Sequence, residues 1–256
     1  MRRLISAWIW VSTGLLVLLW LPWLALVYLV TVPFDPGRYT VGRWFRRTAV
    51  TAVALNPLWT FRTSGVRITD PRRPYVAVSN HESMADIFLV SHLPWEMKWL
   101  SKVENFRIPV LGWMMRMAGD VAIVRSERGS RAEALEECRD RLRKRVSVMI
   151  FPEGTRSRTG ELLPFKDGAF RLAIESGAPI LPLAVAGTRN AMPKGSLLFN
   201  PARAEVRVLE PIPTEGLTLD DVADLRDRVR TLIDEARREL ARELGIGSPL
   251  QERVQR

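Results

Sequence analysis

Tyr75-Val-Ala-Val-Ser-Asn-His-Glu-Ser-Met-Ala-Asp86 is the stretch that indicates the fold most directly. Its first five residues predict an apolar strand, Asn80 and His81 begin a polar turn, and the pattern from residue 84 onward predicts a helix. A buried strand that ends in a polar turn and continues into a helix is the repeating unit of α/β domains. Such domains place their sites at the ends of the strands.

The same alternation continues along the chain beyond Gly65. Short β-branched runs predict strands at residues 75–79, 97–100, 121–124, 146–151, 180–185 and 204–209. Helical patterns fill most of the gaps, at residues 84–91, 104–117, 131–143, 166–176 and 220–244. We therefore expect an α/β fold with a central mixed sheet covered by helices. The sequence shows no internal repeat and no low-complexity linker.

An apolar segment precedes this region, since residues 4–34 include no charged residue. It exceeds both the roughly 20 apolar residues that span a bilayer and the about 7 to 15 of a signal peptide, so we expect it to remain as a membrane anchor. Pro22 predicts a break into short helices, at residues 4–21 and 23–32, that dip into one leaflet as a hairpin; a single span is the alternative. Arginines on both sides of the segment fit a hairpin with both ends in the cytoplasm, whereas a single span needs the Arg2-Arg3 end outside.

Residues 39–61 include Trp44-Phe45-Arg46-Arg47 and predict a basic amphipathic helix. This helix lies on anionic lipid, or packs on the globular domain, or does both with one face each. We expect three parts in the chain: membrane-anchoring helices at residues 1–64, one globular domain at residues 65–245, and a C-terminal tail at residues 246–256.

The formal net charge of +10 and the sequence pI near 10.7 favour an anionic partner, such as nucleic acid, phospholipid headgroups or a phosphorylated substrate. The single cysteine, Cys138, excludes an intrachain disulfide and a cysteine metal cluster, and it indicates a reducing cytoplasmic setting. It lies in the helical pattern Ala134-Leu-Glu-Glu-Cys-Arg-Asp-Arg-Leu, which predicts a buried helix thiol rather than a nucleophile.

The two histidines, His81 and His92, are the candidates for a proton acceptor that works near neutral pH. His81 is the better one, because Asp86 follows it closely. Five residues of a regular helix turn through about 500°, which would separate the two side chains. We therefore expect His81 in the turn before the helix, with Asp86 reaching back to one ring nitrogen as the carboxylate of a catalytic triad does. A helix-capping histidine is the alternative.

A second polar element, Phe151-Pro-Glu-Gly-Thr-Arg-Ser-Arg158, follows the strand predicted at residues 146–151. Gly154 allows close approach of the backbone to a ligand, and Arg156 or Arg158 can hold phosphate oxygens by paired, charge-assisted hydrogen bonds. This composition predicts a phosphate site at a strand end. A surface turn with a Glu–Arg ion pair is the alternative.

Together the two elements resemble the motifs of the glycerolipid acyltransferase family, in particular its bacterial 1-acylglycerol-3-phosphate acyltransferases. The family's Asn-His-x4-Asp motif matches Asn80, His81 and Asp86, and its Phe-Pro-Glu-Gly-Thr-Arg-Ser motif matches residues 151–157. Two further stretches are similar to family motifs, at residues 112–125 and in Ile180-Leu-Pro-Leu-Ala-Val-Ala-Gly, and Ser101-Lys102 also looks familial.

The resemblance implies transfer of a fatty acyl group from acyl-CoA or acyl carrier protein to the free hydroxyl of 1-acylglycerol 3-phosphate, a lysophospholipid acceptor. His81 and Asp86 would be the catalytic base pair, and no metal or other cofactor is expected. The residues implied in binding and positioning the acceptor phosphate are Lys102, Arg125, Glu153, Gly154, Thr155 and Arg156. Glu153 cannot itself bind an anion, so it would orient an arginine, accept a hydrogen bond from the acceptor hydroxyl, or have a structural role. We further expect an anionic membrane surface as a partner, no nucleic acid, and a place at the bacterial inner membrane with the catalytic domain on the cytoplasmic face.

Other functions stay open on the sequence alone. Within the same chemistry the acceptor could be glycerol 3-phosphate, another lysophospholipid or a lyso-aminolipid. A non-catalytic membrane lipid-binding scaffold is an alternative from another class. The positive charge alone would also suit a nucleic-acid-binding protein, against which stand the long apolar segment and the lack of an aromatic-basic recognition motif.

Overall fold

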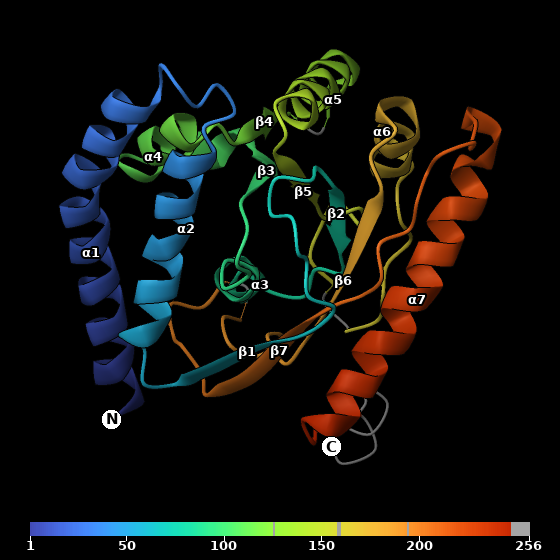
Figure 1. Ribbon diagram of the computed structural model, residues 1–256. Coiled ribbons are helices and arrows are strands. Elements are labelled where there is room, and N and C mark those ends of the chain that lie inside the picture. The colour runs from blue at the N-terminus through green and yellow to red at the C-terminus, as the bar shows by residue number, and fades with distance from the viewer. Residues whose placement is uncertain (125, 158–159, 194, 247–256) are drawn as a thin grey trace.

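The computed structural model describes residues 1–124, 126–157, 160–193 and 195–246. Within these residues the chain forms one seven-stranded sheet, in the spatial order β1-β7-β6-β2-β5-β3-β4 (Figure 1). The strands are β1 (Trp59–Gly65), β2 (Val76–Ser79), β3 (Met97–Lys102), β4 (Val121–Ile123), β5 (Ser147–Ile150), β6 (Ile180–Ala186) and β7 (Ala202–Val208).

The sheet is mixed. Every neighbouring pair of strands is parallel except β6 and β7, which are antiparallel. The predicted fold class, an α/β domain with a central mixed sheet covered by helices, is therefore confirmed. Since β4, β3, β5, β2 and β6 all run the same way, their carboxyl ends lie along one edge of the sheet. The polar turns that follow β2 and β5 meet at this edge.

Helices cover both faces of the sheet (Figure 1). On one face residues of α5, α6 and α7 share a core cluster with Val76 and Val78 of β2, and on the other Leu89 of α3 shares a second cluster with Ala77. This alternation follows from the two-residue period of a strand. The helices are α1 (Arg2–Thr31), α2 (Tyr39–Ala54), α3 (Ala85–Val90), α4 (Leu111–Ala118), α5 (Arg128–Arg143), α6 (Gly168–Ser176) and α7 (Val222–Glu243), with 3-10 turns η1 (Val103–Arg107) and η2 (Leu219–Asp221).

Two predicted helices differ from the structure. The helix expected at residues 39–61 ends at Ala54, and β1 follows it as an edge strand paired with β7, which extends the sheet across the boundary expected at residue 64. The helix expected at residues 104–117 is divided into η1 and α4. Pro109 explains the division, because proline donates no backbone hydrogen bond and disfavours helical geometry in the residue before it, and Val110 takes a φ of 65°.

α1 is one continuous helix with Pro22 inside it, so the predicted break at Pro22 is wrong. Beyond the proline, Leu24 and Val27 are buried against α2 and α4. Burial of such side chains stabilises the packed helix by about 1.5–3 kcal/mol each, which offsets the roughly 3 kcal/mol cost of an interior proline.

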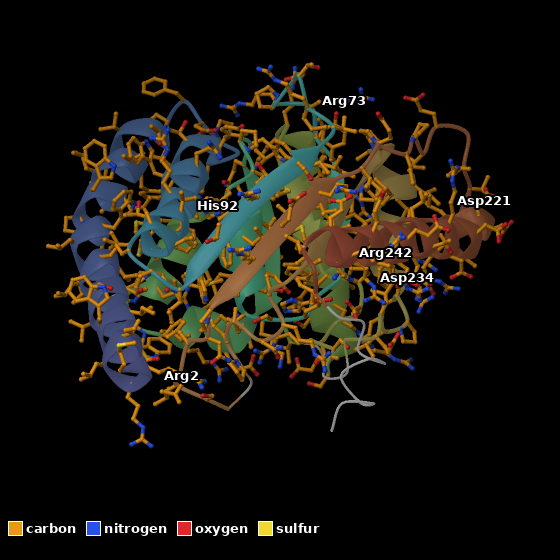
Figure 2. All side chains as sticks on the ribbon, turned by 90° about the horizontal axis from the view of Figure 1, so that it is seen from below. Arg2, Arg73, His92, Asp221, Asp234 and Arg242 are labelled. Carbon is orange, nitrogen blue, oxygen red and sulfur yellow. The ribbon has the colours of Figure 1, made fainter. Side chains whose placement is uncertain are left out.

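α1 runs antiparallel to α2 along one side of the molecule (Figure 1). The Ser6 hydroxyl accepts a hydrogen bond from the Phe199 N–H at 3.0 Å, and the Trp20 indole donates to the Trp44 carbonyl at 3.0 Å. α1 is thus attached to the domain near its start and beyond its middle. Figure 2 shows the side chains on its outer side pointing away from the rest of the molecule. The large apolar side chains of α1 that are exposed are Leu4, Trp8, Trp10, Val11, Leu15, Leu18, Leu19, Trp23, Leu26, Leu29 and Val30.

Buried charges join α2 to the sheet. The Arg46 guanidinium, only 6% of whose residue is exposed, pairs with Asp120 and lies 3.6 Å from the Glu96 carboxylate. The Lys98 ammonium, also buried, lies 3.1 Å from Glu96. Burial raises the pKa of Glu96 and lowers that of Lys98, and their mutual attraction opposes both shifts. Arg46 therefore faces the globular domain, not lipid.

We predict that Gly42→Ala lowers the free energy of unfolding by about 1–3 kcal/mol. A methyl group at Gly42 would clash with the Glu96 carboxylate and the Lys98 ammonium, so α2 would have to move away from β3. Thermal unfolding of the detergent-solubilised protein measures the loss. Gly14→Ala is the matched control, because nothing lies within 4 Å of the added group in α1. Equal melting temperatures for the two variants would contradict the prediction.

Candidate active site

His81 lies in the turn after β2, and Asp86 in the first turn of α3. The His81 Nδ1 and an Asp86 carboxylate oxygen are 2.7 Å apart. The same oxygen accepts hydrogen bonds from the backbone N–H groups of Glu82, at 2.8 Å, and Ser83, at 2.9 Å. The other oxygen accepts one from the Thr188 hydroxyl. The arrangement is the one expected from the spacing, with the ring in the turn and the acid reaching back.

This pairing determines what the imidazole can do. A carboxylate only accepts hydrogen bonds, so the Nδ1 atom of His81 donates to Asp86 and Nε2 is left as the proton acceptor. Asn80 holds the end of β2 in place, because its side chain makes hydrogen bonds of 2.9 and 2.8 Å with the backbone carbonyl and N–H of Val185 in β6. His81 is thus a buried imidazole with a fixed orientation at the edge of the sheet.

The loop after β5 is bound directly to this turn. The His81 N–H donates to the Glu153 carboxylate at 2.6 Å, and the other Glu153 oxygen accepts from the Leu163 N–H at 3.0 Å. The Ser157 N–H donates to the His81 carbonyl at 2.9 Å. The Phe151 ring stacks on the imidazole, with centroids 4.0 Å apart. The two motifs recognised in the sequence therefore share one site.

Glu153 is a positioning residue in this arrangement. Burial raises the pKa of its carboxyl, and the hydrogen bonds from Leu163 and His81 oppose the shift. Because its two oxygens hold the backbone of both loops, Glu153 fixes the distance between them.

The remaining residues expected at the phosphate site are spread around this centre. Gly154 adopts a φ of 70°, which favours glycine, and borders an apolar cavity of about 260 Å³. Arg156 lines a separate cavity of about 540 Å³ together with Glu82 and Arg189. Thr155 is exposed.

Two cationic residues predicted at this site are not joined to it by any described contact. Lys102 is exposed at the end of β3 and has no side-chain hydrogen bond or ion pair within the described part of the chain. Arg125 lies outside the described residues.

The sequence reasoning missed Thr188 and Arg189. Both follow β6, more than 100 positions after His81, and no local spacing relates them to the Asn-His motif. The one available signal was that β6, if parallel to β2, would end at the same edge. Among the described residues, no group of three or more His, Cys, Asp and Glu side chains is placed to hold a metal ion.

Comparisons with known proteins identify a family for the part of the chain that holds these loops. A family model described as Acyltransferase matches residues 61–186, which include both loops around His81. Residues 61–186 form an acyltransferase-family domain.

The domain is similar to several curated proteins. The chain is 40% identical over 176 residues to a chloroplastic 1-acyl-sn-glycerol-3-phosphate acyltransferase of Brassica napus, covering 68% of this chain and 48% of that protein. It is 40% identical over 162 residues to the human 1-acyl-sn-glycerol-3-phosphate acyltransferase alpha, covering 62% and 57%. The chain thus spans about half the length of the curated relatives it matches.

The crystal structure of the 1-acyl-sn-glycerophosphate acyltransferase PlsC from Thermotoga maritima has the same fold as this chain. The TM-score is 0.76, and the match covers 93% of this chain and 95% of that one. The two sequences are only 23% identical. The similarity therefore extends beyond the acyltransferase domain to α1 and α7.

Cys138 takes no part in the site of the acyltransferase domain. It is buried in α5, which confirms the prediction of a buried helix thiol, and burial raises its pKa to about 12. A thiol with such a pKa is protonated throughout the neutral range and is a poor nucleophile.

We predict that Cys138 in the folded protein reacts with a thiol-specific chromogenic reagent at about pH 8 at least about a hundredfold more slowly than in denaturant, where its pKa returns to about 8.5. The absorbance of the released thiolate measures both rates. Equally fast labelling in the absence of denaturant would show that the thiol is accessible and ionised, contrary to this assignment.

Proposed function

We propose that the protein transfers a fatty acyl group from a thioester donor, acyl-CoA or acyl carrier protein, to the free hydroxyl of 1-acylglycerol 3-phosphate, which yields phosphatidic acid. The observation that carries the proposal is the buried His81–Asp86 pair held against the Phe151–Ser157 loop. The acyltransferase domain match and the names of the curated relatives support the same reaction.

In the proposed mechanism, His81 Nε2 accepts the proton of the acceptor hydroxyl as that oxygen attacks the thioester carbonyl. Asp86 steadies the imidazolium that forms, since its carboxylate is already hydrogen-bonded to Nδ1. The tetrahedral intermediate then collapses, the C–S bond breaks, and the thiolate takes the proton back from His81. The products are an ester and a free thiol, and no acyl-enzyme intermediate is required, because a thiolate is a good leaving group.

The acceptor phosphate is assigned to the loop after β5 and its neighbours. Arg156 supplies a planar guanidinium suited to paired hydrogen bonds with phosphate oxygens, and Gly154 and Thr155 lie beside it in the loop. Lys102, at the end of β3, is proposed to add positive charge, and so is Arg125, which lies outside the described residues. Glu153 holds this loop on His81 rather than contacting the phosphate, because both of its carboxylate oxygens are already bonded to backbone N–H groups.

The acyl chains of the proposed substrates and the exposed apolar side chains of α1 both suit a membrane surface. The exposed apolar side of α1 is proposed to enter the lipid while its other side stays packed on the domain. Within the described residues α1 is the helix long and apolar enough to cross a membrane. Its attachments through Ser6 and Trp20 favour a helix that lies along the bacterial inner membrane over one that crosses it, with the catalytic domain on the cytoplasmic side.

We predict that His81→Ala lowers the rate of acyl transfer at least about a hundredfold while the protein stays folded and membrane-bound, because the general base is lost. The assay uses detergent-solubilised protein, lysophosphatidic acid and both donor types, with circular dichroism as the folding control. His92→Ala is the matched variant, since His92 bonds the Phe88 carbonyl on α3, away from the Asp86 pair, and should keep normal activity. Substantial activity in His81→Ala would refute the assignment of the base.

Arg156→Ala should chiefly raise the KM for lysophosphatidic acid, by about tenfold or more, because a charge-assisted bond to phosphate contributes about 1.5–3 kcal/mol. Initial rates at varied acceptor concentration measure the change. The same variant should discriminate less between lysophosphatidic acid and a phosphate-free lysolipid. An unchanged KM would count against Arg156 as the phosphate ligand, and a clear preference of the unmodified protein for the phosphate-free acceptor would overturn the choice of substrate.

A further inference from the structure

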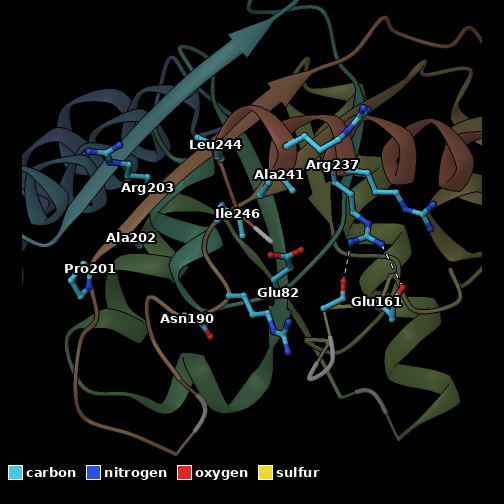
Figure 3. Close-up of a pocket in the computed structure, with 16 residues that line it drawn as sticks. Glu82, Glu161, Asn190, Pro201, Ala202, Arg203, Arg237, Ala241, Leu244 and Ile246 are labelled. Atoms are coloured by element: carbon cyan, nitrogen blue, oxygen red, sulfur yellow. Dashed lines mark hydrogen bonds and ion pairs between the residues drawn. The ribbon is translucent and has the colours of Figure 1, made fainter. Parts of the chain in front are cut away.

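A cavity of about 760 Å³ opens next to the turn that holds His81 (Figure 3). Its wall includes Glu82, then Gly187, Arg189 and Asn190 after β6, and the last turns of α7. This volume falls in the range of about 300–1,000 Å³ typical of small-molecule sites. Arg156, assigned above to the acceptor phosphate, lines a different cavity that shares Glu82, Arg189 and Asn190 with this one. The two cavities therefore meet at the catalytic turn.

Arginines surround the larger cavity. Arg189 lines it from the loop after β6, and Arg237, Arg238 and Arg242 line it from α7. Arg238 and Arg242 are one helical turn apart, so they project from the same side of the helix. Arg242 is exposed, and its side chain has no hydrogen bond or ion pair with any residue that the structure describes. Five arginines and two glutamates, Glu82 and Glu161, thus line the cavity, so its described lining carries more positive than negative groups although Arg238 is also paired with Asp234, at 2.7 Å.

Arg237 fixes the position of this wall relative to the loop after β5. It is buried, and its guanidinium donates to the Gly160 carbonyl at 2.9 Å and to Asp234 at 2.7 Å. Figure 3 shows Arg237 reaching from α7 to the loop that carries Glu161. The loop after β5 is thereby tied to α7, and the arginine-lined wall exists before any ligand enters.

Apolar side chains and the Glu82 carboxyl also line the cavity. Ala186, Ala241, Leu244 and Ile246 line it between the arginines. Burial, with the nearby Asp86 charge, raises the pKa of Glu82 to about 8 against the opposing attraction of Arg237 and Arg189. At neutral pH this carboxyl is therefore mostly protonated and does not repel an anion. A ligand that combines an apolar planar ring with several phosphates suits such a cavity.

We propose that this cavity binds the adenosine 3′-phosphate and diphosphate end of a coenzyme A thioester, with the pantetheine arm leading past Glu82 to His81. The inference rests on the proposed acyl transfer and assigns the donor to coenzyme A rather than to acyl carrier protein. The prosthetic arm of a carrier protein has one phosphate and no nucleotide, so it would leave the ring site and most of the arginines unused.

A binding experiment tests the cavity without turnover. Isothermal titration of the detergent-solubilised full-length protein with adenosine 3′,5′-bisphosphate should show saturable binding. The double variant Arg238→Ala/Arg242→Ala should weaken it at least about tenfold, because each arginine supplies charge-assisted bonds to phosphate. Arg228→Ala is the matched control, since Arg228 is exposed on the same helix and lies outside the cavity. No binding to the unmodified protein, or equal binding to all three proteins, overturns the proposal.

Kinetics separate this inference from the proposed function. The double variant should raise the KM for palmitoyl-CoA at least about tenfold and leave the KM for lysophosphatidic acid unchanged, and the bisphosphate should compete with the donor only. Nucleotide binding through these arginines without any acyl transfer would support the cavity and refute the proposed function. Efficient transfer from acyl carrier protein, unaffected by the double variant and without nucleotide binding, would refute the cavity and leave the proposed function standing.

Discussion

The Glu153 carboxylate joins two loops whose residues are 72 positions apart in the chain, and the chemistry of the site depends on this contact. It accepts the N–H of His81 through one oxygen and that of Leu163 through the other, while the Ser157 N–H bonds the His81 carbonyl. These bonds use the backbone of His81 and leave its imidazole free. The ring can therefore stack on Phe151 and pair with Asp86 at the same time.

The parallel pairing of β2 with β5 makes this contact possible. Two parallel neighbours end at the same edge, so the turns that follow them meet, and β6 on the other side of β2 brings Thr188 to Asp86. The Asp86 carboxylate is held rigidly, because both of its oxygens accept hydrogen bonds from surrounding donors. The orientation of the imidazole therefore comes from three segments at once, and this is the kind of preorganisation that a general base needs.

The site lies between an apolar side and an arginine-rich side of the molecule. On one side, α1 and Trp113 of α4 present exposed apolar side chains, and the buried charges of Arg46, Glu96 and Lys98 attach α2 firmly to the sheet. On the other side, α7 presents arginines around a cavity. Figure 1 shows α1 and α7 on opposite sides of the molecule, with α3 between them. A lipid acceptor and a polyanionic donor could thus reach one imidazole from different directions.

The sequence by itself determined the features that depend on local pattern. The period of apolar residues predicted most strands and helices, and the spacing of His81 and Asp86 predicted a ring in the turn with the acid behind it, because neighbouring residues constrain each other through the backbone. Only the tertiary structure decided that α1 stays straight through Pro22, that residues 59–65 form an edge strand, and that Arg46 is buried. It also decided that Thr188 and Asn80 complete the support of the base. Each of these outcomes depends on contacts between segments far apart in the chain, which no local pattern records.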